Sequence, residues 1–193
     1  MNRRTFAAFA AAGLLGVLFA AGAAARAGAG PLSGELQSVR AAVAKYHSYD
    51  QALAAGYSAS GEPCVAAPGL GTMGYHAVNF GLLSSGAIDP LQPPILLYAP
   101  RADGSLGLAG VEYWMVALVS TPDGPRPWFS QDDPRDAGLT FFNPAPSLFG
   151  QPFDGPMAGH NPDMPWHYDL HVWLITENPA GIFAQFNSAI RCR

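Results

Sequence analysis

The stretch 167–175 reads HYDLHVWLI and decides what kind of sheet this chain can build. Aromatic and branched residues dominate it and Pro165 precedes it, so it predicts a strand rather than a helix. Alternate side chains of a strand share one face, which places His167, Asp169 and His171 together. At about 3.3 Å per residue, His167 and His171 lie about 13 Å apart, too far to share one ion easily. Neighbours on that face, His167/Asp169 and Asp169/His171, are each about 7 Å apart, and either pair can converge on one ion.

Two earlier segments predict strands that pair into a hairpin. Residues 95–98 (ILLY) stand between Pro94 and Pro100 and read as a short buried strand. The dipeptide at Asp103 and Gly104 predicts a turn into a second strand over about 106–119. These strands and the stretch 167–175 predict an antiparallel sheet.

Helical spacing of apolar residues precedes the sheet. The spacing predicts one amphipathic helix from Ser33, as its cap, to about Gly56. The residues that form its apolar stripe are Leu36, Val39, Val43, Tyr46 and Leu53. Residues 61–74, rich in glycine and proline, predict a loop, and residues 179–186 predict a short helix or turn.

Residues 121–165 contain ten prolines, which exclude a long helix or a central strand. The segment also holds more aromatic residues than a solvated linker carries, so we expect it to pack over the core. These aromatic residues are Trp128, Phe129, Phe141, Phe142, Phe149 and Phe153. The expected fold class is therefore α+β: an antiparallel sheet with an N-terminal amphipathic helix and a long proline-rich covering loop.

The N-terminus predicts an export signal. Residues 1–27 carry Arg3 and Arg4, then an apolar stretch, then Ala25-Arg26-Ala27, which suggests cleavage before Gly28. The paired arginines resemble a twin-arginine signal, which implies export of a folded chain by that route to the periplasm or beyond. The ordinary secretory route and an uncleaved anchor are the alternatives, although the apolar stretch is short for a membrane span.

Length and charge bound what the remaining chain can be. Residues 28–193 are long enough for one globular domain and too short for a two-domain dinucleotide enzyme. Removing the signal leaves seven basic residues against fourteen acidic ones, a net charge of −7. A chain this acidic is not expected to carry the positively charged surface that binds nucleic acid or anionic lipid.

Two cysteines, Cys64 and Cys192, stand far apart in the sequence. In an exported protein an even pair indicates one disulfide, here closing a loop of about 130 residues and adding about 4–5 kcal/mol of stability. The alternative is a pair of thiolate metal ligands, although the chain has no C-x-x-C spacing.

Four of the five histidines lie in two short motifs, and this clustering predicts a transition-metal site. His76 ends the motif Gly74-Tyr75-His76, while His160, His167 and His171 fall within twelve residues. We expect His76, His167 and His171 to bind the ion, with His160, Asp169 and Glu112 as further ligands. Imidazole with carboxylate suits Zn, Cu, Fe or Mn, and the nearby residues Met73, Met157 and Met164 add a small preference for copper.

Ordinary structural roles are the alternative for each of these residues. Loop histidines often bond to a carbonyl group or lie in solvent, and strand histidines can pair with Asp169 or with the backbone. Glu112 can face solvent, and His47 is expected on a helix surface. The H-x-D pattern from His167 matches half of an iron-oxygenase triad, but no histidine follows His171 in the sequence. The chain has no nucleotide-binding loop, no serine-hydrolase elbow and no H-E-x-x-H motif.

Five strings together resemble a group of exported bacterial proteins. They are GTMGYH (71–76), LLYAP (96–100), GVEY (110–113), FGQPFDGPM (149–157) and HYDLHVW (167–173). The resemblance runs from about Val39 to Cys192 and implies that the mature chain is one unit. It implies no particular reaction or ligand set.

Three functions remain open from the sequence. The first is an exported transition-metal-binding protein with a His/carboxylate site, which can be a small metalloenzyme acting on a small molecule. The second is a metal-free periplasmic module that binds a small ligand or a partner protein. The third is a structural envelope protein without a small-molecule site.

Overall fold

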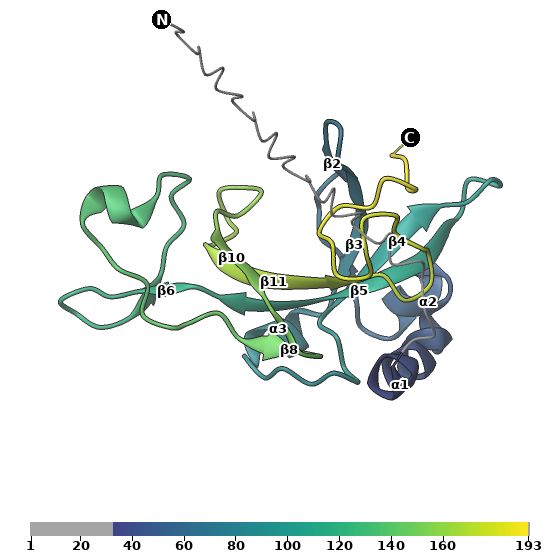
Figure 1. The fold of residues 1–193 in the computed structure, drawn as a ribbon, viewed down its shortest axis with the longest axis horizontal. Coiled ribbons are helices and arrows are strands. Elements are labelled where there is room, and N and C mark those ends of the chain that lie inside the picture. The colour runs from purple at the N-terminus through teal and green to yellow at the C-terminus, as the bar shows by residue number, and fades with distance from the viewer. Residues whose placement is uncertain (1–32, 193) are drawn as a thin grey trace, which may run out of the picture.

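The chain folds into a mixed α+β structure built on one large antiparallel sheet. The computed structural model describes residues 33–192, and the predicted export signal therefore lies outside the described residues. Its seven-stranded sheet has the order β1-β3-β4-β5-β11-β10, with β2 also paired to β3, and every pairing is antiparallel. The strands are β1 (Ser58–Ala59), β2 (Val65–Ala67), β3 (Gly71–Val78), β4 (Ile95–Pro100), β5 (Leu106–Val116), β10 (Asp154–Met157) and β11 (His167–Val172) (Figure 1).

The three expected strands are confirmed as β4, β5 and β11. β4 and β5 form the predicted hairpin, and Gly104 in the turn between them has a φ of 87° that favours glycine. β11 pairs with β5 along its whole length. Residues 179–186 form turns, which was one of the two expectations for that segment.

The single N-terminal helix expected between Ser33 and Gly56 is wrong in its length. The chain instead forms α1 (Gly34–Val43), the 3-10 turn η1 (Ala44–Tyr46) and α2 (Tyr49–Ala54). The break occurs where the backbone joins the sheet, because Ser48 bridges to Gly107 and the carbonyl of His47 accepts from the Leu108 amide. These bonds to β5 take backbone groups that a continuous helix would have used.

The expected loop over residues 61–74 is also wrong, because it contains β2 and the first half of β3. Glycine suggested a loop, but two of these glycines serve close packing within the sheet. A Cβ atom at Gly71 would lie 2.4 Å from the Asn187 backbone, and one at Gly74 would lie 2.5 Å from the carbonyl oxygen of Tyr98. Both residues also have positive φ, which side chains other than glycine rarely adopt.

Helices cover one face of the sheet. Leu36, Val39 and Val43 of α1 are buried in a cluster that includes Tyr98 and Tyr113 of the sheet. Figure 1 shows α1 and α2 on one side of the sheet and the C-terminal segment on the other. The opposite face carries a smaller apolar cluster and a group of buried polar side chains.

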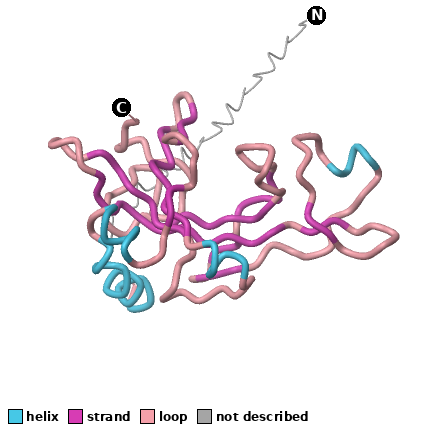
Figure 2. Tube along the Cα trace, turned by 180° about the vertical axis from the view of Figure 1, so that it is seen from behind, coloured by secondary structure: helices cyan, strands magenta, loops and turns pink. Residues whose placement is uncertain are grey.

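The proline-rich segment contains only short elements, as expected. They are β7 (Arg126–Pro127), η2 (Pro134–Ala137), β8 (Ser147–Leu148), β9 (Gln151–Pro152) and the edge strand β10; β6 (Leu118–Val119) precedes them. Phe153 is buried in the core, whereas Phe129 and Phe142 are half exposed or more, at 50% and 59%. The part that contains η2 extends away from the sheet (Figure 2), so the segment covers the core only in part.

A disulfide joins Cys64 to Cys192, as predicted, with a sequence separation of 128 residues. The alternative that these sulfurs bind a metal as thiolates is therefore wrong. The bridge ties the C-terminal tail to the segment before β2. Across residues 33–192, every helix is too short or too polar to cross a membrane.

Candidate metal centre

Three neighbouring parts of the sheet deliver one group of metal-ligating side chains. His76 comes from β3, Glu112 from β5 and His171 from β11. Strand register explains the convergence. Glu112 of β5 lies directly across from His171 of β11. On the other side, His76 pairs with Leu97 of β4, and Leu97 pairs with Gly110, which is two residues from Glu112 on the same face of β5. The three side chains are buried, and one ligand atom from each lies within 4.8 Å of the others.

The separations between these ligand atoms fit a shared ion. Glu112 Oε2 is 3.3 Å from His76 Nε2 and 3.6 Å from His171 Nε2. Most hydrogen bonds are shorter than this. Ligand bonds of 2.0–2.2 Å in a tetrahedral shell place neighbouring ligand atoms about 3.3–3.6 Å apart. The group therefore has the spacing of a coordination shell and can hold a metal ion.

Several polar atoms of this group are buried with their hydrogen-bonding capacity unused. Among the residues described, Glu112 Oε2, His76 Nδ1 and both ring nitrogens of His171 lack a hydrogen-bond partner. A buried polar atom without a partner costs about 1–3 kcal/mol, and a charged one costs more. A bound cation would compensate the carboxylate and the lone pair of His171 together.

Asp169 lies behind this group, beside His171. Its Oδ1 is 3.7 Å from Nδ1 of His171, the ring nitrogen opposite the one that faces Glu112. A histidine that binds a metal commonly gives its other ring hydrogen to such a carboxylate, which fixes the ring orientation. Asp169 is thus placed as a positioning residue for His171.

Charge dominates this buried region. Burial opposes the charged form of His171, but Glu112 and Asp169 outweigh it and raise the pKa of this imidazole to about 9. Burial alone would raise the pKa of Asp169, but His171 and His167 hold it below its ordinary range. The protein without metal therefore favours a proton where an ion would bind.

His167 stands outside the group of three, although we expected it among the principal ligands. It is fully buried, stacks on Trp114, and its Nε2 lies 3.8 Å from Asp169 Oδ2. Along β11 it lies four residues from His171, and Asp169 stands between them. Glu112, for which solvent exposure was the alternative, is 3% exposed and belongs to the group.

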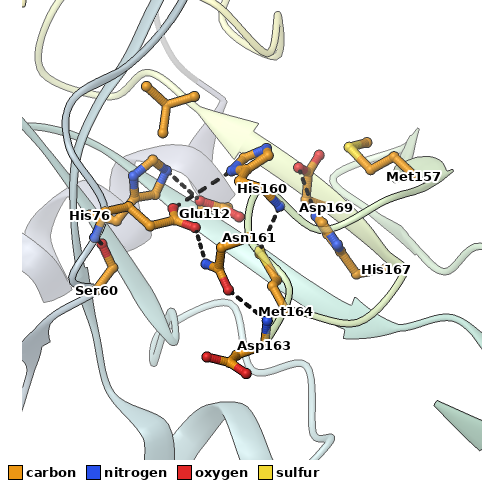
Figure 3. Close-up of polar contacts among 12 residues, drawn as sticks. Ser60, His76, Glu112, Met157, His160, Asn161, Asp163, Met164, His167 and Asp169 are labelled. Atoms are coloured by element: carbon orange, nitrogen blue, oxygen red, sulfur yellow. Dashed lines mark hydrogen bonds and ion pairs between the residues drawn. The ribbon is translucent and has the colours of Figure 1, made fainter. Parts of the chain in front are cut away.

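His160 approaches from a loop. Its Nδ1 lies 3.7 Å from Glu62 Oε2, and the Asn161 amide donates to Glu62 Oε1 over 2.6 Å. The Glu62 carboxylate raises the pKa of His160, while His160 lowers that of Glu62. Figure 3 shows this loop beside His76 and Glu112. Glu62 was missed by sequence reasoning, because it is an isolated acidic residue in a loop whose partner lies 98 positions away.

The methionines contribute little to the centre. The sulfur of Met164 accepts from the backbone amide of His160, and that of Met157 accepts from the Gln185 side chain. Met73 is buried in β3. Their sulfurs are outside the group of three, and His47 is exposed as expected.

A pocket of about 740 Å³ opens beside the group. Its polar lining includes Glu62, His76, Glu112, His160 and Asp163, and its apolar lining includes Val78, Phe80, Leu83, Ile95 and Trp114. The described residues that line it include carboxylates but no lysine or arginine. The pocket therefore suits a small molecule that is neutral or cationic and partly apolar.

Neither the sequence nor the fold matches a protein-family model, a curated protein or a solved structure. The chemistry of the centre therefore follows from its own geometry.

Proposed function

We propose that this protein is an exported binder of a divalent transition-metal ion, held by His76, Glu112 and His171. The observation that supports it most is the spacing of 3.3 and 3.6 Å between Glu112 Oε2 and the two imidazole nitrogens. Two imidazoles and one carboxylate suit zinc, copper or iron. Three protein ligands leave a coordination position for a small molecule, and His76 and Glu112 both line the pocket.

Metal analysis of matched variants tests this function. The mature chain is purified without a histidine tag, stripped with chelator, loaded with Zn²⁺, Cu²⁺, Fe²⁺ or Mn²⁺, and analysed for bound metal and affinity. Glu112→Gln and His76→Gln should each weaken binding at least a hundredfold, because each removes a ligand. His47→Gln removes an exposed histidine and should bind like the parent chain. A parent chain that binds none of these ions, or variants that bind as tightly, would refute the proposal.

Export is the second part of the proposal, and it is supported by the N-terminal pattern and by the Cys64–Cys192 bridge. Disulfides persist mainly in oxidising compartments. Replacing Arg3 and Arg4 together by lysine should stop export by a twin-arginine route and leave the secretory route working. Fractionation of cells that produce both forms checks this, and unchanged export of the double variant would contradict the twin-arginine route.

A metal-free binding module remains a second candidate, favoured by the apolar half of the pocket. Val78, Phe80 and Ile95 offer contact area to a small ligand without any ion. This function predicts thermal stability that is indifferent to chelator and added metal. The metal titration above separates the two candidates.

A further inference from the structure

We infer that the same face of the sheet holds a second metal position, formed by His167 and Asp169. This inference deepens the proposed metal function and rests on it, but it uses different ligands and can fail alone. It begins with the tautomer of His167.

The backbone fixes which ring nitrogen of His167 carries a hydrogen. Its Nδ1 lies 3.0 Å from the carbonyl oxygen of Pro165. A carbonyl oxygen can only accept, so Nδ1 must carry the hydrogen. In a neutral imidazole the lone pair is then on Nε2, which points to Asp169 Oδ2 at 3.8 Å.

Two acceptors thus face each other in a fully buried place. In the described part of the chain, His167 Nε2 and both oxygens of Asp169 have no hydrogen-bond partner, and both residues are 0% exposed. Facing lone pairs need a positive charge between them, supplied by a proton or by a metal ion. A separation of 3.8 Å is too long for a hydrogen bond but within the span of two ligand bonds of about 2.0–2.2 Å to one ion.

His160 lies between this position and the pocket. Its ring meets that of His167 edge-on, with centroids 6.1 Å apart. In the view of Figure 3 the His160 ring lies between the carboxyl groups of Glu112 and Asp169. His160 lines the pocket, whereas His167 and Asp169 are covered, so an ion reaches them past His160.

Asp169 links the two positions. Oδ2 faces His167, while Oδ1 faces Nδ1 of His171, which belongs to the first group. A cation on Oδ2 draws electron density from the carboxylate that orients His171. Occupation of one position is therefore expected to change the affinity of the other.

The competing interpretation is a proton on His167 Nε2 that forms an ion pair with Asp169. It fills the same space without any metal. The two interpretations differ in the number of ions bound per chain, and that number decides between them.

The test is the stoichiometry of Zn²⁺ and of Co²⁺ on the mature, untagged chain. The parent and His47→Gln should bind two equivalents, whereas His167→Gln and His76→Gln should each bind one. One equivalent in the parent, lost in His76→Gln and kept in His167→Gln, would overturn the second position and leave the proposed function standing. No bound ion in the parent would overturn both.

A measurement on the parent chain alone covers the case in which His167→Gln does not fold. Cu²⁺ is added in steps and followed by electron paramagnetic resonance. A second equivalent should broaden the spectrum of the first by dipolar coupling, because Asp169 contacts a ligand of each position. Simple addition of signals, or free Cu²⁺ beyond one equivalent, would overturn the second position.

Discussion

The two faces of the sheet both bury polar groups, but the helix-covered face pairs its tyrosine hydroxyls, whereas the opposite face leaves several carboxylate oxygens and ring nitrogens unpaired. The buried tyrosine hydroxyls on that face all donate to backbone carbonyls. These bonds run from Tyr57 to Pro93, Tyr98 to Tyr46, Tyr113 to Pro90 and Tyr168 to Asn143, at 2.6–2.8 Å. Side chains on this face stabilise the fold and need nothing further.

The opposite face holds two buried carboxylates and three buried imidazoles. The closest separations between their carboxylate oxygens and ring nitrogens are 3.3–3.8 Å. Burying such groups without partners lowers stability, and this cost supports the proposal that they bind an ion. The contrast teaches that burial alone does not mark a core. Whether the buried polar atoms have hydrogen-bond partners distinguishes the helix-covered face from the face that we propose binds an ion.

The largest effect should come from shortening leucines on the two faces. Leu96 and Leu97 are both fully buried and adjacent, but Leu96 belongs to the helix-side core and Leu97 pairs with His76. Each change to alanine should lower the free energy of unfolding by about 2–5 kcal/mol, measured by urea denaturation. Only Leu97→Ala should also weaken metal binding; equal affinities in both variants would break the distinction between the faces.

The next effect is a pH dependence of the metal-free chain. His171 has a raised pKa of about 9 in the fold, because Glu112, Asp169 and Asp154 outweigh its burial, against about 6.5 when unfolded. A group with a raised pKa in the fold stabilises the folded chain fully at any pH below its pKa in the unfolded chain. This stability is lost as the pH rises through its pKa in the folded chain. For His171 the loss is about 3 kcal/mol between pH 6.5 and 9.

Urea denaturation at pH 6 and pH 9.5 measures this loss, and His171→Gln should flatten it. Metal affinity should rise over the same range, because the ion displaces the proton from His171. A metal-free chain equally stable at both values would contradict the assigned charge of this face.

Metal should stabilise the fold by a somewhat smaller amount. A ligand that binds only the folded chain adds about 2.7 kcal/mol at a hundred times its Kd. Thermal denaturation with metal, and again after chelator, measures the shift. Glu112→Gln should show almost none, and a full shift in that variant would place the ion elsewhere.

The smallest effect is expected from a single tyrosine on the helix side. Tyr113→Phe removes the bond to the Pro90 carbonyl, 2.6 Å long, and should cost about 1 kcal/mol in unfolding free energy. Metal affinity should stay unchanged in the same samples. A loss of affinity as large as that of a ligand variant would show that the two faces are not independent.

Much of the sheet was predictable from local patterns. An apolar run between prolines identified β4, the turn at Asp103 and Gly104 indicated β5, and aromatic and branched residues identified β11; the cysteine count indicated the disulfide. β3 was missed because Gly71 and Gly74 look like loop residues until the segments they touch are known. The break between α1 and α2 depends on Ser48 pairing with Gly107, a contact between distant parts of the chain.

The residues of the candidate site were predictable from the sequence. Which of them lie together in space was not. Alternation placed His167, Asp169 and His171 on one face. The register of β11 against β5 decides that His171, not His167, meets Glu112. No local pattern encodes that register, because it depends on how whole strands align.

Because its three ligands are separated by 36 and 59 positions along the chain, the centre exists only after β11 has joined the sheet. A chain emerging from a membrane channel unfolded would have no comparable affinity, and its ion would come from the supply outside the cell membrane. A chain exported already folded would carry an ion chosen from those available in the cytoplasm. The route of export would then select the metal before the ligands do.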